Sequence, residues 1–153
     1  DILSEAAEHS VELVSYGSVV AATDNDAYNT LVATDLAPEF GREHVYQLKR
    51  AKQQSRRHAL PATLGGRAVG NGQGFFELNR LMTEGWRFRI TRLSEEFTRE
   101  HWREKNPEAV VFAVVGPNGT PRLVSAEEEL RAGPGNRLIA LVPPGDEAQA
   151  AAG

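Results

Sequence analysis

The chain has 153 residues, of which 41% are hydrophobic and 25% are charged, and its formal net charge is -4 at pH 7. This length suits one ordinary domain or two small ones, and the composition is that of a globular protein. The mild negative charge gives no electrostatic case for nucleic acid or an anionic membrane surface as a partner. The absence of cysteine excludes disulfides, thiol catalysis and cysteine-based zinc sites.

The N-terminal residues and the apolar runs indicate neither a signal peptide nor a membrane span. The first residues lack the basic and apolar regions of a signal peptide, and no run approaches the ~18 apolar residues that a membrane span needs. The chain opens on Asp1 rather than on an initiator Met. We therefore expect a fragment of a longer protein.

The first fifty residues predict a helix–strand–helix–strand order. An amphipathic helix is expected over residues 4–13, and the apolar run 18–22 is typical of a strand buried on both faces of a parallel sheet. Apolar side chains recur at helical spacing over residues 26–38, with Pro38 and Gly41 expected to close the helix, and residues 44–48 predict the next strand. We expect the two strands to be parallel neighbours joined by a right-handed crossover.

The second half of the chain predicts a different pattern. A basic, polar stretch at 51–64 is interpreted as a linker, residues 65–142 as a small α+β domain, and residues 143–153 as a disordered tail. Asn118-Gly119 predicts a hairpin turn. The expected elements of this half are a helix at 75–83, a strand at 86–93, a helix at 94–105, and strands at 110–115, 122–124 and 137–142.

Two of these elements carry predictions about which side chains are buried. The strand at 86–93 alternates apolar and polar residues, so one face is expected inside and the other outside. Its inward residues are expected to be Trp86, Phe88 and Ile90, and its outward residues Arg87, Arg89 and either Thr91 or Arg92. Exposed aromatic side chains there would instead indicate an interface. The helix at 94–105 is expected to be capped by Ser94 and to turn Phe97, His101 and Trp102 inward.

The sequence holds no convincing catalytic constellation. Its four histidines are too scattered for a metal-binding helix motif, and no serine lies in a nucleophile elbow. Adjacent carboxylates such as Glu95 and Glu96 lie near a predicted helix start, where negative charge is favourable, so we interpret them as helix-capping residues and not as a catalytic pair.

The segment with the clearest functional signal is Thr23-Asp24-Asn25. It lies where a predicted buried strand passes into a helix N-terminus, and ligands of open α/β sheets bind outside the carboxyl ends of the strands. Short polar side chains at this position can contact a ribose. The alternative is that Asn25 or Asp26 is merely the N-cap of the helix. Both interpretations stay open from the sequence pattern alone.

Residues 17–29 and 40–48, which read Gly-Ser-Val-Val-Ala-Ala-Thr-Asp-Asn-Asp-Ala-Tyr-Asn and Phe-Gly-Arg-Glu-His-Val-Tyr-Gln-Leu, resemble the second half of TrkA-N/RCK domains. The version in the cytoplasmic tails of NhaP-like sodium:proton antiporters is the most similar. Residues 133–139 are similar, more weakly, to the closing segment of RCK-C-like tails. The expected fold is α/β: a partial Rossmann-like parallel sheet, without its Gly-rich first half, followed by a small α+β unit.

The resemblance implies a non-enzymatic, nucleotide-sensing regulatory module at the cytoplasmic face of the membrane. Its ligand would be NAD(H) or an adenine nucleotide, and its partners would be the transport domain of the same protein and a second copy in a dimer. The implied binding residues are Asp1, near the adenosine, with Thr23, Asp24 and Asn25 opposite.

The sequence departs from the family in one respect. The family's Gly-rich turn would precede the matched region. Gly70-x-Gly72-x-Gly74 is interpreted as no substitute, because no clear strand precedes it and its spacing differs from G-x-G-x-x-G. Whether this fragment binds nucleotide without that half stays open. The alternative functions are a truncated Rossmann-type oxidoreductase and a dimerisation module without a ligand.

Overall fold

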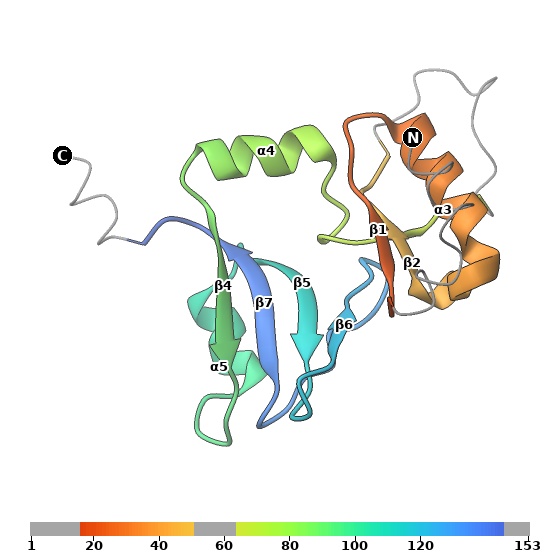
Figure 1. The fold of residues 1–153 in the computed structure, drawn as a ribbon. Coiled ribbons are helices and arrows are strands. Elements are labelled where there is room, and N and C mark those ends of the chain that lie inside the picture. Colours follow the sequence, from red (N-terminus) through yellow and green to blue (C-terminus); the bar gives the residue numbers. More distant parts are fainter. Residues whose placement is uncertain (1–15, 51–63, 146–153) are drawn as a thin grey trace. The chain divides into compact units, whose positions relative to one another are not determined.

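The computed structural model describes residues 16–50 and 64–145, which belong to two compact units (Figure 1). The first unit extends to Phe75 and the second begins at Phe76. A parallel sheet and an antiparallel sheet are both present with helices, so the α/β fold class is confirmed. The expected helix at 4–13 lies outside the described residues, as do nearly all of the expected linker and most of the expected tail.

The first unit is built on a three-stranded parallel sheet in the order β1-β2-β3. Val19 on β1 lies opposite Val45 on β2, and Tyr46 on β2 lies opposite Arg67 on β3. The predicted parallel pairing of the first two strands is therefore confirmed. The elements of this unit are β1 (Val19–Ala21), α3 (Asp26–Phe40), the short 3-10 helix η1 (Arg42–His44), β2 (Val45–Gln47) and β3 (Arg67–Ala68).

Helix α3 packs on the sheet and contributes to both apolar clusters of the first unit. It continues two residues past Pro38, and its end is fixed by Gly41, whose φ of 81° favours glycine. Two apolar clusters join it to the strands: Ala21 with Val32 and Leu36, and Val45 with Ala33 and Ala37. Strand β1 is less enclosed than predicted, because it lies at the edge of the described sheet and Val20 is 43% exposed.

Strand β3 was not predicted, and it changes where the first unit ends. Its pairing with β2 places Gly65, Gly66 and the following glycine-rich turn in the first unit, whereas the sequence had assigned residues 65–142 to the second domain. A Cβ atom on Gly66 would lie 2.7 Å from the carbonyl carbon of Tyr46. The lack of a side chain at this position therefore allows β3 to approach β2 closely.

The second unit contains an antiparallel sheet in the order β4-β7-β5-β6. The predicted hairpin is present between β5 and β6, and Gly119 in its turn has a φ of 83°. The elements are α4 (Phe75–Thr83), which begins at the boundary, β4 (Arg87–Arg92), α5 (Arg99–Lys105), β5 (Val110–Val115), β6 (Pro121–Leu123) and β7 (Arg137–Val142).

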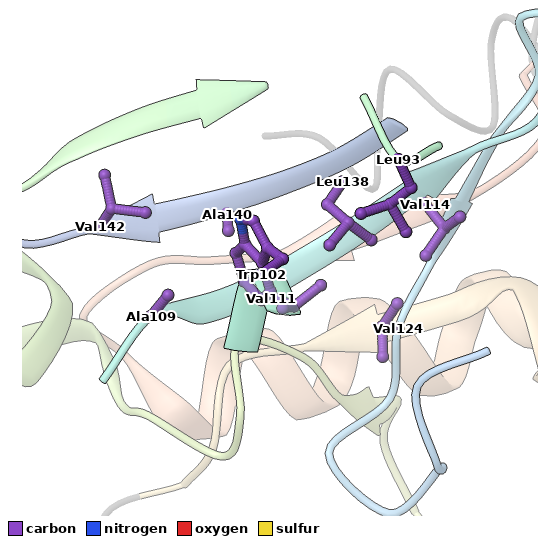
Figure 2. Close-up of a cluster of buried hydrophobic side chains, with 9 residues drawn as sticks. All are labelled: Leu93, Trp102, Ala109, Val111, Val114, Val124, Leu138, Ala140 and Val142. Carbon is purple, nitrogen blue, oxygen red and sulfur yellow. The ribbon is translucent and has the colours of Figure 1, made fainter. Parts of the chain in front are cut away.

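One face of this sheet packs against α5 to form the core of the second unit (Figure 2). Trp102 of α5 is 2% exposed. The side chains around it are Leu93, Ala109, Val111, Val114, Val124, Leu138, Ala140 and Val142. Helix α5 starts later than predicted, because Thr98 rather than Ser94 accepts the capping hydrogen bond, while Ser94 closes a separate turn with Phe97. His101 is exposed, so its predicted burial was wrong.

The predicted burial of β4 was also wrong. Phe88 is 51% exposed and Ile90 is 63% exposed, while Trp86 is half-buried just before the strand. The reason is that β4 is an edge strand and that α5 covers the opposite sheet face. The arginines of β4 are exposed, as predicted. Helix α4 has no fully buried residue, and Met82 on its apolar face is 44% exposed.

Candidate functional site

Three segments leave the carboxyl edge of the parallel sheet of the first unit. Residues 22–25 follow β1, residues 48–50 follow β2, and residues 69–74 follow β3. Because all three strands are parallel, their carboxyl ends lie at the same edge, which is where α/β sheets bind ligands. We call these three segments together the carboxyl-edge site.

Backbone hydrogen bonds hold the three segments beside one another. The amide of Leu48 donates to the carbonyl of Ala21 at 3.1 Å, and the amide of Val69 donates to the carbonyl of Gln47 at 3.1 Å. The amide of Lys49 donates to the carbonyl of Gln73 at 3.3 Å. The segments after β2 and β3 are thus joined beyond the sheet itself.

The turn after β1 is fixed by Asn29, a residue that the sequence reasoning missed. Its side chain is 1% exposed, and its Oδ1 accepts from the amide of Thr23 at 3.0 Å and from the hydroxyl of Thr23 at 2.7 Å. Its Nδ2 donates to the carbonyl of Thr23 at 2.8 Å. One buried amide therefore pins both the backbone and the side chain of Thr23 to the first turn of α3.

Asn25 is the N-cap of α3, as one of the two interpretations of the sequence predicted. Its Oδ1 accepts from the amide of Tyr28 at 3.0 Å, and its own amide donates to the hydroxyl of Thr23 at 3.2 Å. Thr23 and Asn25 therefore use their side chains to shape the turn. Their effect on a ligand would come mainly through the backbone groups that they position.

Asp24 is the predicted site residue that is left available. It is exposed, and it makes no hydrogen bond or ion pair with any residue that the structure describes. Asp1 lies outside the described residues. Across the site, Lys49 is exposed two residues after the end of β2, just before the predicted linker at 51–64. The carboxyl-edge site thus presents one carboxylate after β1 and a cation after β2.

The glycine-rich turn Gly70–Gly74 corrects a second expectation. It does follow a strand, since β3 ends at Ala68, and it leads directly into α4. Gly70, Asn71 and Gly72 all have positive φ, of 69°, 53° and 70°, a conformation that glycine and asparagine adopt most readily. Gly70 is buried, residues 72–74 are half-buried and Asn71 is exposed, so only part of this turn is accessible at the third position of the carboxyl edge.

The titratable groups of the described residues do not form a metal centre. No cluster of three or more histidine, aspartate or glutamate side chains suited to a metal ion occurs within 16–50 and 64–145. None of the helices in those ranges has the length and apolar character needed to cross a membrane. The site instead offers a partly accessible turn after β3, the exposed carboxylate of Asp24 and the exposed ammonium group of Lys49. No family model, curated protein or solved structure matched the chain.

Proposed function

We propose that this chain is the nucleotide-sensing part of a regulatory region attached to a prokaryotic cation:proton antiporter, and that it acts at the cytoplasmic face of the membrane. The observation that carries the proposal is the carboxyl-edge site: a polar turn between β1 and α3, with a cation after β2 and a glycine-rich turn after β3. The likeness of residues 17–29 and 40–48 to TrkA-N/RCK domains supports the assignment to an antiporter.

The chemistry of the site suits NAD(H) or an adenine nucleotide. The Asp24 carboxylate can accept hydrogen bonds from ribose hydroxyls, and the Lys49 ammonium group can neutralise a phosphate. The accessible part of the turn after β3, around Asn71, and the positive N-terminal end of α3 favour a polar or anionic ligand at the same edge. In such a module the ligand binds two conformations of a dimer with different affinities and so shifts the balance between them.

Calorimetric titration of the chain with NAD, NADH, ATP, ADP and AMP tests the proposal. Asp24→Ala and Lys49→Ala should each weaken binding of the preferred nucleotide roughly fivefold to a hundredfold, the effect of one lost charge-assisted hydrogen bond. Asp35→Ala is the matched control, because Asp35 is exposed on α3 away from its N-terminus. The first unit keeps its fold in all three variants, because none of these side chains is buried.

Asn25→Leu is a poor probe of the site, because it removes the N-cap of α3 as well as any ligand contact. Asp24→Ala has no such effect. Equal affinity for wild type and Asp24→Ala would remove the turn after β1 from the ligand site. Turnover of a nicotinamide cofactor with a hydroxy acid would favour the oxidoreductase, and a dimer without nucleotide affinity would favour the dimerisation module.

A further inference from the structure

The second unit has a sheet face that α5 does not cover. Side chains of β7 alternate between the two faces of the sheet. Leu138 and Ala140 pack against α5 on one face, so Ile139 points to the other face. Ile90 of β4 is the cross-strand neighbour of Ile139. Four residues of this side on β5 and β7 are buried: Val110, Ala113, Val115 and Leu141. We define the Phe88 face by the residues of this side that are exposed or half-buried: Phe88, Ile90, Arg92, Phe112, Arg137 and Ile139.

The apolar part of the Phe88 face is exposed along the edge strand β4 and half-buried at Phe112 and Ile139. The rings of Phe88 and Phe112 meet edge-on with centroids 5.1 Å apart, although β7 separates their strands. Leu141 of β7, the cross-strand neighbour of Phe88, is fully buried. Phe88 and Ile90 nevertheless remain 51% and 63% exposed. Two large exposed apolar side chains on the same face of one edge strand are a candidate interaction surface.

One end of the Phe88 face carries an unbalanced positive charge. Arg92 and Arg137 are direct cross-strand partners, and both are exposed. Neither guanidinium group makes a hydrogen bond or ion pair with the part of the chain that the structure describes. Like charges placed directly opposite each other destabilise a sheet. A carboxylate bound between these two arginines would remove that repulsion.

We propose that the Phe88 face binds an acidic amphipathic helix of a partner protein. The apolar stripe of that helix would lie along the edge strand β4 and cover Phe88, Ile90 and the half-buried Ile139. Carboxylates at one end of the helix would pair with Arg92 and Arg137, since a guanidinium group binds a carboxylate through two parallel hydrogen bonds. The charge of the face selects the partner, and its apolar side chains supply the buried area.

A second copy of the chain fits this face less well. A two-fold interface brings the same residues of two copies together. Strands β4, β5, β6 and β7 contain no aspartate or glutamate, so a second copy would bring two more arginines and no counter-charge from these strands. The charge therefore favours a partner of opposite sign over self-association through this face.

Two matched amphipathic peptides test the proposal with the full chain. Both carry leucine on one helical face, and they differ only in having glutamate or lysine at the flanking positions. We expect the acidic peptide to bind with saturable NMR shifts at the Ile90 and Ile139 methyl groups, and the basic peptide to bind at least roughly tenfold more weakly. Arg92→Glu with Arg137→Glu should reverse this preference. Arg131→Glu, at an exposed loop arginine, should leave it unchanged.

Three results would overturn the proposal: equal affinity for the two peptides, shifts at other methyl groups only, or no binding of the acidic peptide. The Ile90→Ser variant distinguishes a partner helix from two other possible occupants of the Phe88 face, namely another part of the same chain and a second copy of the chain. It should abolish peptide binding but leave the Tm within about 2 °C of wild type, since the residue is largely exposed. A large drop in Tm would mean that the chain itself covers the face. Loss of a dimer in sedimentation would mean that a second copy does.

Discussion

Replacing Asn29 with alanine should loosen the turn that shapes the carboxyl-edge site. The side chain makes three hydrogen bonds to Thr23, at 3.0, 2.7 and 2.8 Å, and is 1% exposed. Each such bond contributes about 1 kcal/mol net, so the free energy of unfolding of the first unit should fall by about 2–4 kcal/mol. The polar groups of Thr23 regain water in the variant because this residue is exposed, which keeps the loss within that range.

The assay must report on the first unit alone. Both tryptophans, Trp86 and Trp102, lie in the second unit, so their fluorescence does not follow the first. Amide hydrogen exchange along α3 does. In Asn29→Ala these amides should exchange roughly 30- to 1,000-fold faster, the factor that corresponds to about 2–4 kcal/mol.

A double-mutant cycle checks the reasoning more closely. Thr23→Val removes the hydroxyl that donates to Asn29, so the losses from the two single variants should not add. The expected coupling is about 1–2 kcal/mol. Asp35→Ala, on the exposed side of α3, should change the free energy by less than about 0.5 kcal/mol. Additive losses, or wild-type exchange rates in Asn29→Ala, would refute the account of this turn.

The remaining predictions concern single contacts. Gly66→Ala should destabilise the first unit by about 1–3 kcal/mol, because its Cβ would lie 2.7 Å from the backbone of Tyr46; the exposed Gly17→Ala is its control, and equal exchange rates along β2 would contradict the prediction. Arg103→Ala should lower the Tm of the second unit by about 4–8 °C. The Arg103 guanidinium group donates to the carbonyl of Ala109 at 2.9 Å, and its carbon lies 5.0 Å from the centroid of the Trp102 ring. Calorimetry measures the shift, and an unchanged Tm would show that these two contacts do not stabilise the unit. Asn25→Asp keeps a capping oxygen and should preserve stability within about 0.5 kcal/mol, whereas Asn25→Ala should lose about 1 kcal/mol by urea unfolding; equal losses would contradict the capping role.

The sequence correctly predicted the helices and strands that have a long apolar pattern or clear capping and turn residues at their ends. Helix α4, strand β5 and strand β7 begin and end where they were expected, and the parallel pairing of β1 with β2 followed from two apolar runs around one helix. Strand β3 escaped notice because two residues show no periodicity, and its place depends on the missing side chain of Gly66.

The alternation of β4 shows a different limit. It correctly places Phe88 and Ile90 on one face and Arg87 and Arg89 on the other, but it does not say which face is covered. That choice depends on α5, whose start shifted because Ser94 closes a turn with Phe97 and leaves capping to Thr98. The exposure of Phe88 is therefore decided by tertiary packing and not by the local sequence pattern.

The sequence predicted the position of the candidate site at the carboxyl edge of the sheet, but not all of the residues that form it. The turn after β1 was expected at the carboxyl edge from the capping residues that follow an apolar run. The role of Asn29 was hidden because its partner is six residues away and the contact exists only once the turn has formed. Lys49 was not singled out as a site residue. Gly70–Gly74 was interpreted as part of the second domain, since only the pairing of β3 with β2 brings this turn to the same edge.

The most direct test of the central claim is an NMR titration of the chain with NADH and with ATP at millimolar concentration. The account predicts saturable shifts of the backbone amides in residues 22–26, 48–50 and 69–74, with Asp24→Ala weakening the response and Asp35→Ala leaving it unchanged. Absence of any saturable shift, or shifts confined to the second unit, would contradict nucleotide sensing at the carboxyl-edge site.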